Sequence, residues 1–162
     1  IQDIKHIKIE DLLHRDPIRL HLEKIKSELA GKVILVTGAA GSIGSEMVRQ
    51  IINFEPQKLV VLDQAESPLV DLELEILEHH PYANLYPVVA DICDEVNLDR
   101  IFREHRPQVV FHAAAYKHVP MMERHPEQAV KVNVLGTKNV ADMSVAYKAE
   151  KFVMISTDKA VN

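Results

Sequence analysis

The sequence predicts an α/β fold in which helices cover both faces of a doubly wound parallel sheet. From Gly31 onward, short apolar runs alternate with longer segments whose apolar residues recur at helical spacing. The short runs are continuously apolar, as expected for strands that are buried on both faces of a parallel sheet. With right-handed crossovers, five strand–helix units give most simply the strand order 3-2-1-4-5.

The expected elements follow in chain order. Residues 1–30 form a charged, helix-prone leader with helical segments at 9–13 and 18–29, and residues 31–162 form the sheet domain. In that domain we expect strands at 32–37, 58–63, 84–90, 108–112 and 151–156, and helices at about 43–53, 67–79, 94–105 and 126–148. The apolar face of 126–148 is a candidate surface for self-association into a homo-oligomer, and core packing is the alternative.

Composition excludes several classes of protein. The 162 residues carry a net charge of -5 without clustered Lys and Arg, so we expect no nucleic-acid partner. The single cysteine excludes an internal disulfide framework, and no signal peptide or membrane-spanning run is visible, so a cytoplasmic location is expected. No metal is expected, because the histidines lack metal-ligand spacing; surface or capping roles are expected for His79, His80, His112, His118 and His125.

A glycine-rich turn follows the first apolar strand and opens an amphipathic helix. This arrangement places the pyrophosphate of a dinucleotide on a helix N-terminus. Gly38 permits the tight turn, Gly41 lets backbone N–H groups approach phosphate oxygens, and Gly44 lets the helix pack close to the sheet. An ordinary turn is the alternative. The residues assigned here to cofactor binding are Gly38, Gly41, Ser42, Ile43 and Gly44.

The next three strand ends supply further candidates for cofactor binding. Asp63 ends the second strand, where a carboxylate can accept hydrogen bonds from the adenosine ribose and would repel a 2′-phosphate, which favours NAD over NADP. Asp91 and Ile92 close the third strand near the expected adenine position. Helix capping is the alternative for both aspartates. After the fourth strand, the small residues Ala113, Ala114 and Ala115 let the backbone lie against the dinucleotide, although helix–sheet packing also favours small residues.

A hydroxyl, a carboxylate and an amine follow the fifth strand. Thr157, Asp158 and Lys159 leave the carboxyl end of that strand, the sheet edge at which ligands bind. Together they supply the groups needed for acid–base chemistry on a sugar. A capped turn is the alternative.

Four segments resemble one family. They are GKVILVTGAAGSIGSE at 31–46, HAAAYKHVPMME at 112–123, NVLGT at 133–137 and STDKAVN at 156–162. The chain from about residue 9 is similar to CapD-like polysaccharide-biosynthesis proteins, the nucleotide-sugar 4,6-dehydratases of the extended short-chain dehydrogenase/reductase superfamily. This resemblance implies an NAD(P)-binding Rossmann fold. It also implies that a full-length protein is anchored through a membrane-embedded N-terminal region, because residues 9–13 resemble the linker that follows such a region in the long members.

The resemblance also implies a reaction and its residues. A retained NAD(P) would take a hydride from C4 of a UDP-N-acetylhexosamine, water would leave across C5 and C6, and the hydride would return to C6. Thr157 would hydrogen-bond the C4 hydroxyl, Asp158 would protonate the departing hydroxyl, and Lys159 would remove the C5 proton. Asn133 would bind cofactor. Lys117 and His118 would bind substrate, and a solvated surface position is the alternative for Lys117.

One motif of the superfamily is absent. Its Tyr/Met-x-x-x-Lys pair and the substrate-binding region would fall after Asn162, so the fold is expected to be truncated there. The chain begins with Ile1 and ends within an expected loop, so we expect both ends to continue in the gene product. We therefore expect these residues alone to bind cofactor weakly and to turn over no sugar. A UDP-sugar C4 epimerase or oxidoreductase and a non-catalytic dinucleotide-binding module are the alternative functions.

Overall fold

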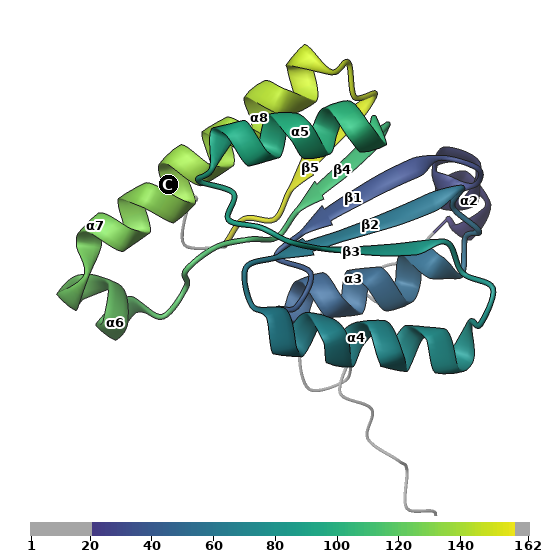
Figure 1. Cartoon of the computed structure of the whole chain (residues 1–162), viewed down its shortest axis with the longest axis horizontal. Helices are drawn as coiled ribbons and strands as arrows, with labels where there is room; N and C mark the ends of the chain where they lie inside the picture. Colours follow the sequence, from purple (N-terminus) through teal and green to yellow (C-terminus); the bar gives the residue numbers. More distant parts are fainter. Residues whose placement is uncertain (1–20, 158–162) are drawn as a thin grey trace, which may run out of the picture.

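The computed structural model describes residues 21–157 and shows the predicted α/β fold. Its strands are β1 (Val33–Thr37), β2 (Lys58–Asp63), β3 (Leu85–Val89), β4 (Val109–His112) and β5 (Lys151–Met154). Its helices are α2 (Leu22–Leu29), α3 (Ser42–Ile52), α4 (Glu66–His79), α5 (Glu95–His105), α6 (Val119–Arg124), α7 (Pro126–Ala129), the π-helix η1 (Val130–Gly136) and α8 (Thr137–Ala146). All strand pairs are parallel, and their order β3-β2-β1-β4-β5 confirms the prediction (Figure 1). The expected helical segment at 9–13 lies outside the described residues.

Helices cover both faces of the sheet. Figure 1 shows α3 and α4 on one face and α5 and α8 on the other. Because successive side chains of a strand point to opposite faces, each central strand contributes to both helical layers. In β1, Ile34 and Val36 pack on the α3 and α4 side, and Leu35 packs on the α5 and α8 side. The apolar runs of the sequence therefore become strands buried between two layers.

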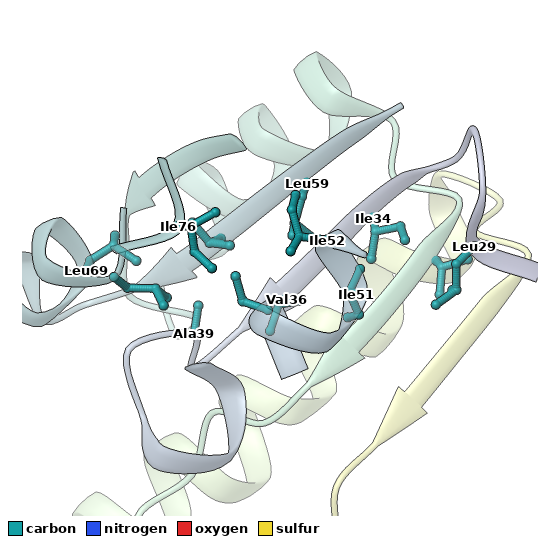
Figure 2. Packing of buried hydrophobic residues seen from close by; sticks show 13 residues of the cluster. Leu29, Ile34, Val36, Ala39, Ile51, Ile52, Leu59, Leu69 and Ile76 are labelled. Atoms are coloured by element: carbon teal, nitrogen blue, oxygen red, sulfur yellow. The ribbon is translucent and has the colours of Figure 1, made fainter. Parts of the chain in front are cut away.

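The larger of the two cores lies between the sheet and helices α3 and α4. Figure 2 shows this cluster, in which Ile34 and Val36 of β1 lie among Ile51 and Ile52 of α3 and Leu59 of β2. These side chains are at most 7% exposed. Close packing here fixes α3 against the sheet, and with it the glycine-rich turn from which α3 begins.

Helix α2 docks on the flank of the sheet domain. Its last residue, Leu29, belongs to the same buried cluster, and Ile25 packs against that cluster one turn earlier. The Lys151 ammonium of β5 forms an ion pair with the Glu28 carboxylate. The C-terminal part of the expected leader thus packs against the sheet domain. Within residues 21–157, no helix has the length and apolarity needed to cross a membrane.

The two edge strands depart from the expectation of continuous burial. Tyr86 and Val89 of β3 and Val153 and Met154 of β5 are exposed, because within residues 21–157 each of these strands pairs with only one other strand. Strand β3 also contains Pro87. The Ala90 N–H donates to the Asp63 carbonyl in β2, so alternation along the strand turns the Pro87 nitrogen away from β2. An edge strand tolerates proline at such a position.

The helix expected at 126–148 is helical up to residue 146 but is not one regular α-helix. Residues 130–136 adopt π winding between α7 and α8. On this segment Gly136 lies close to Ile92, since a Cβ at residue 136 would be 2.6 Å from the Ile92 Cδ1 atom. The wide turn accommodates an extra residue that apolar periodicity does not reveal. The structure also contains the short helix α6, which the sequence pattern did not predict.

Candidate functional site

The glycine-rich turn joins β1 to α3 at the carboxyl edge of the sheet. Gly38 has a φ of +68°, and a Cβ there would lie 2.5 Å from the Ala114 backbone nitrogen. A Cβ at Gly44 would lie 2.0 Å from the Gly38 carbonyl oxygen. Gly41 is the N-cap of α3 and has no side chain to accept hydrogen bonds from the first helical N–H groups. Those N–H groups have no intrahelical partner, so the start of α3 is suited to bind an anion.

A cleft opens beside this turn at the ends of β1, β2, β3 and β4. Its wall brings together eight residues that the sequence assigned to cofactor binding: Gly38, Gly41, Asp63, Asp91, Ile92, Ala113, Ala114 and Ala115. Leu62, Gln64, Ala90, Tyr116 and Val132 complete it. The first three residues of α3 were also assigned to cofactor binding, but they do not line the cleft: Ser42, Ile43 and Gly44. The cleft therefore lies where ligands bind in open parallel sheets.

The Asp63 carboxylate is held in place by two backbone groups. Its Oδ2 accepts from the Ala40 N–H and its Oδ1 from the Ala65 N–H, both at 3.0 Å. Ala65, not Asp63, is the N-cap of α4. The carboxylate thus links the glycine-rich turn to the residue that begins α4. Each oxygen keeps a further lone pair, so the group can still accept hydrogen bonds from a ribose.

The capping alternative for Asp91 is wrong, because Asp94 is the N-cap of α5 and accepts from the Asn97 N–H at 3.0 Å. The Asp91 carboxylate accepts from the Cys93 N–H at 2.8 Å and lies 3.7 Å from the Lys131 ammonium. Burial, and secondarily the Asp91 carboxylate, raises the pKa of the Cys93 thiol. Asp91 lines the cleft, and its hydrogen bond with the Cys93 N–H fixes the turn after β3.

The loop after β4 crosses towards the glycine-rich turn. The Asn133 side-chain amide of η1 accepts from the Tyr116 N–H and donates to the Tyr116 carbonyl, each at 2.8 Å. The Tyr116 hydroxyl accepts from the Gln64 amide at 3.2 Å. The Lys117 ammonium donates to the Ser42 hydroxyl at 3.3 Å. The Lys117 ammonium thus lies next to the first residue of α3. The Asn133 side chain holds the loop by bonding the Tyr116 backbone.

His112 contradicts the expectation of a surface or capping role. Its side chain is buried, 2% exposed, at the end of β4. Its Nδ1 lies 2.7 Å from the Thr37 hydroxyl and its Nε2 lies 2.9 Å from the Thr137 hydroxyl. Burial lowers the pKa of His112 to about 4, so the ring is neutral, and one hydroxyl donates to it while the other accepts from it. His112 therefore links β1 to the start of α8, one residue before Ala113, which lines the cleft.

The residues assigned to catalysis fall at the end of the described chain. Thr157 is exposed and follows β5 at the carboxyl edge of the sheet, the edge that carries the cleft. Asp158 and Lys159 lie outside the described residues. His118 is the N-cap residue of α6 and is exposed, and it does not line the cleft. Between residues 21 and 157, no three His, Cys, Asp or Glu side chains group as a metal site would require.

Sequence reasoning missed two polar members of the cleft. Gln64 directly follows Asp63, and Tyr116 directly follows the three alanines, so both stand next to residues that the sequence did single out. Adjacency to a strand end was the available signal. Neither residue type carries a dinucleotide signature by itself, and only the fold shows that the two side chains meet.

Comparison with known proteins identifies the family. The model of the family described as "Polysaccharide biosynthesis protein" matches residues 34–162. The chain is 46% identical, over its whole length, to the capsular polysaccharide biosynthesis protein CapD of Staphylococcus aureus, and covers 27% of that protein. It is 33% identical to a UDP-N-acetylglucosamine 4,6-dehydratase (inverting) of Campylobacter jejuni, with 81% of this chain and 38% of that protein aligned.

A solved structure supports the same placement. The UDP-glucose 4-epimerase of Thermus thermophilus in complex with NAD matches with a TM-score of 0.66 and 30% identity, covering 77% of this chain and 37% of the epimerase. The chain thus spans between a quarter and two fifths of the length of these three proteins. It has the Rossmann fold that its motifs predict, and it belongs to the polysaccharide biosynthesis protein family.

Proposed function

We propose that this chain is the cofactor-binding part of an NAD(P)-dependent nucleotide-sugar 4,6-dehydratase. The protein would convert a UDP-N-acetylhexosamine to its 4-keto-6-deoxy product in bacterial surface polysaccharide biosynthesis. The observation that carries the proposal is the cleft, which joins the start of α3 to Asp63 and to the alanines after β4. Relatedness to the Campylobacter dehydratase supports the choice of reaction.

The described residues fit a dinucleotide. Gly41 leaves the start of α3 open to a pyrophosphate, and the Lys117 ammonium at Ser42 adds positive charge there. Asp91 and Ile92 would lie against the adenine, and the alanines leave room beside the nicotinamide ribose. When bound, the cofactor would accept the C4 hydride and return it to C6. Asn133 would contribute by positioning Tyr116, because its side-chain oxygen and nitrogen both form hydrogen bonds with the Tyr116 backbone.

We favour NAD over NADP as the cofactor. The Asp63 carboxylate is fixed at the cleft by the Ala40 and Ala65 N–H groups. A ribose 2′-hydroxyl can donate to this carboxylate, whereas a 2′-phosphate would meet like charge. Glu66 in the first turn of α4 adds negative charge to the same region.

The acid–base steps are assigned to the segment that follows β5. Thr157 would hydrogen-bond the C4 hydroxyl, Asp158 would protonate the C6 hydroxyl as it leaves, and Lys159 would take the C5 proton. Lys117 is 3.3 Å from Ser42 at the cofactor end, so we assign it to the pyrophosphate instead of the sugar. His118 remains a candidate for substrate binding.

Replacing Lys159 by alanine tests the reaction. In the full-length protein, Lys159→Ala is expected to lower the rate of elimination at least about 100-fold, because a positioned base contributes that much. Oxidation at C4 should persist, since the hydride step does not use this amine. Product analysis of UDP-N-acetylglucosamine turnover by mass spectrometry and by cofactor absorbance separates the two steps. Lys24→Ala, at an exposed position on α2, is the control, and undiminished elimination by the Lys159 variant would refute the assignment.

A UDP-sugar C4 epimerase is the second candidate function. Its support is the similarity to the Thermus UDP-glucose 4-epimerase. Epimerisation needs the hydride step but neither a C5 base nor a C6 acid. A wild-type protein that forms only the C4 epimer would therefore replace the dehydratase proposal while leaving the cofactor site intact.

We also propose that the protein forms a homo-oligomer through η1. Val130 and Val134 are 60% and 63% exposed on this helix, and Leu135 is 46% exposed, although Val132 of the same helix is buried. Aspartate at Val134 is expected to shift the full-length protein towards monomer, because it would place a charge in an apolar contact. Light scattering after size-exclusion chromatography measures this shift. Val96→Asp, which alters an exposed valine of α5, should leave the mass unchanged.

A further inference from the structure

The cleft is crossed by a hydrogen bond between two side chains that neither the fold nor the glycine motif requires. We infer that Gln64 and Tyr116 form a bridge over the bound dinucleotide and slow its release. This inference rests on the proposed function, because it assigns a role to two residues of the proposed cofactor site. We call this contact the Gln64–Tyr116 bridge.

Sheet topology places the bridge over the glycine-rich turn. Gln64 follows β2 and Tyr116 lies in the loop after β4, and in the sheet β1 lies between these two strands. A contact between the two side chains must therefore pass across the end of β1. That end is Thr37, and Gly38 begins the turn directly after it.

The contact joins two residues of the cleft wall. The Gln64 Nε2 donates to the Tyr116 hydroxyl at 3.2 Å, and both residues line the same cleft as Gly38 and Gly41. Tyr116 is 37% exposed, so part of this residue is open to solvent. A ligand seated on the glycine-rich turn would lie between that turn and the Tyr116 ring.

Both ends of the bridge have firm supports. The Tyr116 backbone is clamped by the two hydrogen bonds from Asn133, and Lys117 ties the next residue of the loop to Ser42. At the other end, Gln64 lies between Asp63, which is fixed by two backbone N–H groups, and Ala65, which supplies one of them. Opening the cleft therefore needs only rotation of two side chains, without displacement of either support.

Retention of the cofactor suits the proposed reaction. A hydride that leaves C4 and returns to C6 of the same sugar causes no net oxidation, so the dinucleotide need not exchange between turnovers. The bridge opposes release by one hydrogen bond that must break as the ligand leaves. A neutral hydrogen bond of this kind corresponds to about a fivefold change in rate.

Dissociation kinetics of the full-length protein test the bridge. Tyr116→Phe and Gln64→Ala are each expected to raise the NADH dissociation rate constant about fivefold. The double variant should release NADH no faster than the faster single variant, since both changes remove one interaction. Stopped-flow fluorescence, with excess NAD⁺ displacing NADH, measures the rate constants. Thermal unfolding should match the wild type, which separates retention from a structural defect.

Two matched variants control for the chemistry of the substitutions. Tyr82→Phe removes a hydroxyl that is exposed between α4 and β3, and Gln50→Ala removes an exposed amide that donates to Glu46 on α3. Both should leave the dissociation rate constant unchanged. The bridge is refuted if wild-type protein binds NADH and either bridge variant releases it within twofold of the wild-type rate. Wild-type protein that binds no dinucleotide would refute the proposed function and the bridge together.

Discussion

Alanine at Gly38 is expected to lower the free energy of unfolding by about 3 kcal/mol and to abolish dinucleotide binding. The new Cβ would lie 2.5 Å from the Ala114 nitrogen and 2.7 Å from the Ala113 carbonyl carbon. These are backbone atoms of the loop that lines the cleft, so relief of the clash must move that loop. Urea unfolding and NADH fluorescence titration of the full-length protein measure the two effects.

Gly31 provides a control for backbone conformation. Its φ of +69° nearly equals that of Gly38, but a Cβ there would meet nothing within 4 Å. Alanine at Gly31 therefore has to adopt the left-handed conformation but meets no clash. We expect it to lower the free energy of unfolding by about 1 kcal/mol and to leave NADH binding unchanged. Equal losses of stability in the two variants would show that close approach of the loop does not explain the need for Gly38.

Stability is expected to fall on acidification because His112 is buried in its neutral form. Its pKa is about 4 in the folded protein, against 6.5 for an ordinary histidine. Between these values the unfolded state binds more protons, so the contribution of His112 is complete above about pH 6.5 and is lost as the pH falls towards 4. The loss is roughly 3 kcal/mol, since one pKa unit corresponds to about 1.4 kcal/mol. Urea unfolding measured between pH 7 and pH 4 gives this profile.

The variant His112→Gln isolates this contribution. Glutamine can donate and accept hydrogen bonds between Thr37 and Thr137 but does not titrate, so the pH profile should become shallower. Burial, and secondarily Lys58, also lowers the pKa of His105, so the variant retains a second dependence of the same sign. His79→Gln, at an exposed histidine of α4, is the control for the exchange of histidine for glutamine. An unchanged slope in His112→Gln would contradict a buried neutral imidazole.

The sheet and the glycine-rich turn could be predicted because their causes are local. Continuous apolar runs such as 58–63 give central strands, and right-handed crossovers then fix their order. Gly38 and Gly44 are required by close backbone contacts within one strand–turn–helix unit. Asp63 and Asp91 follow from their positions at strand ends, so the fold brings them into one cleft without further information.

The remaining features depend on contacts between segments distant in the sequence. No apolar or charged pattern in the sequence around His112 reveals its two threonine partners. Thr37 lies on β1 and Thr137 lies at the start of α8. The π winding at 130–136 preserves helical composition, so periodicity cannot distinguish it from an α-helix. Gln64 and Tyr116 follow β2 and β4, the two strands that flank β1, so their contact depends on the strand order of the sheet.

Pro87 limits the capacity of strand β3 for addition of a further strand. Its nitrogen faces away from β2 and carries no hydrogen, so the outer side of β3 lacks a donor in the middle of the strand. Intermolecular β-pairing is therefore hindered at β3, and self-association by sheet extension should not begin at that strand.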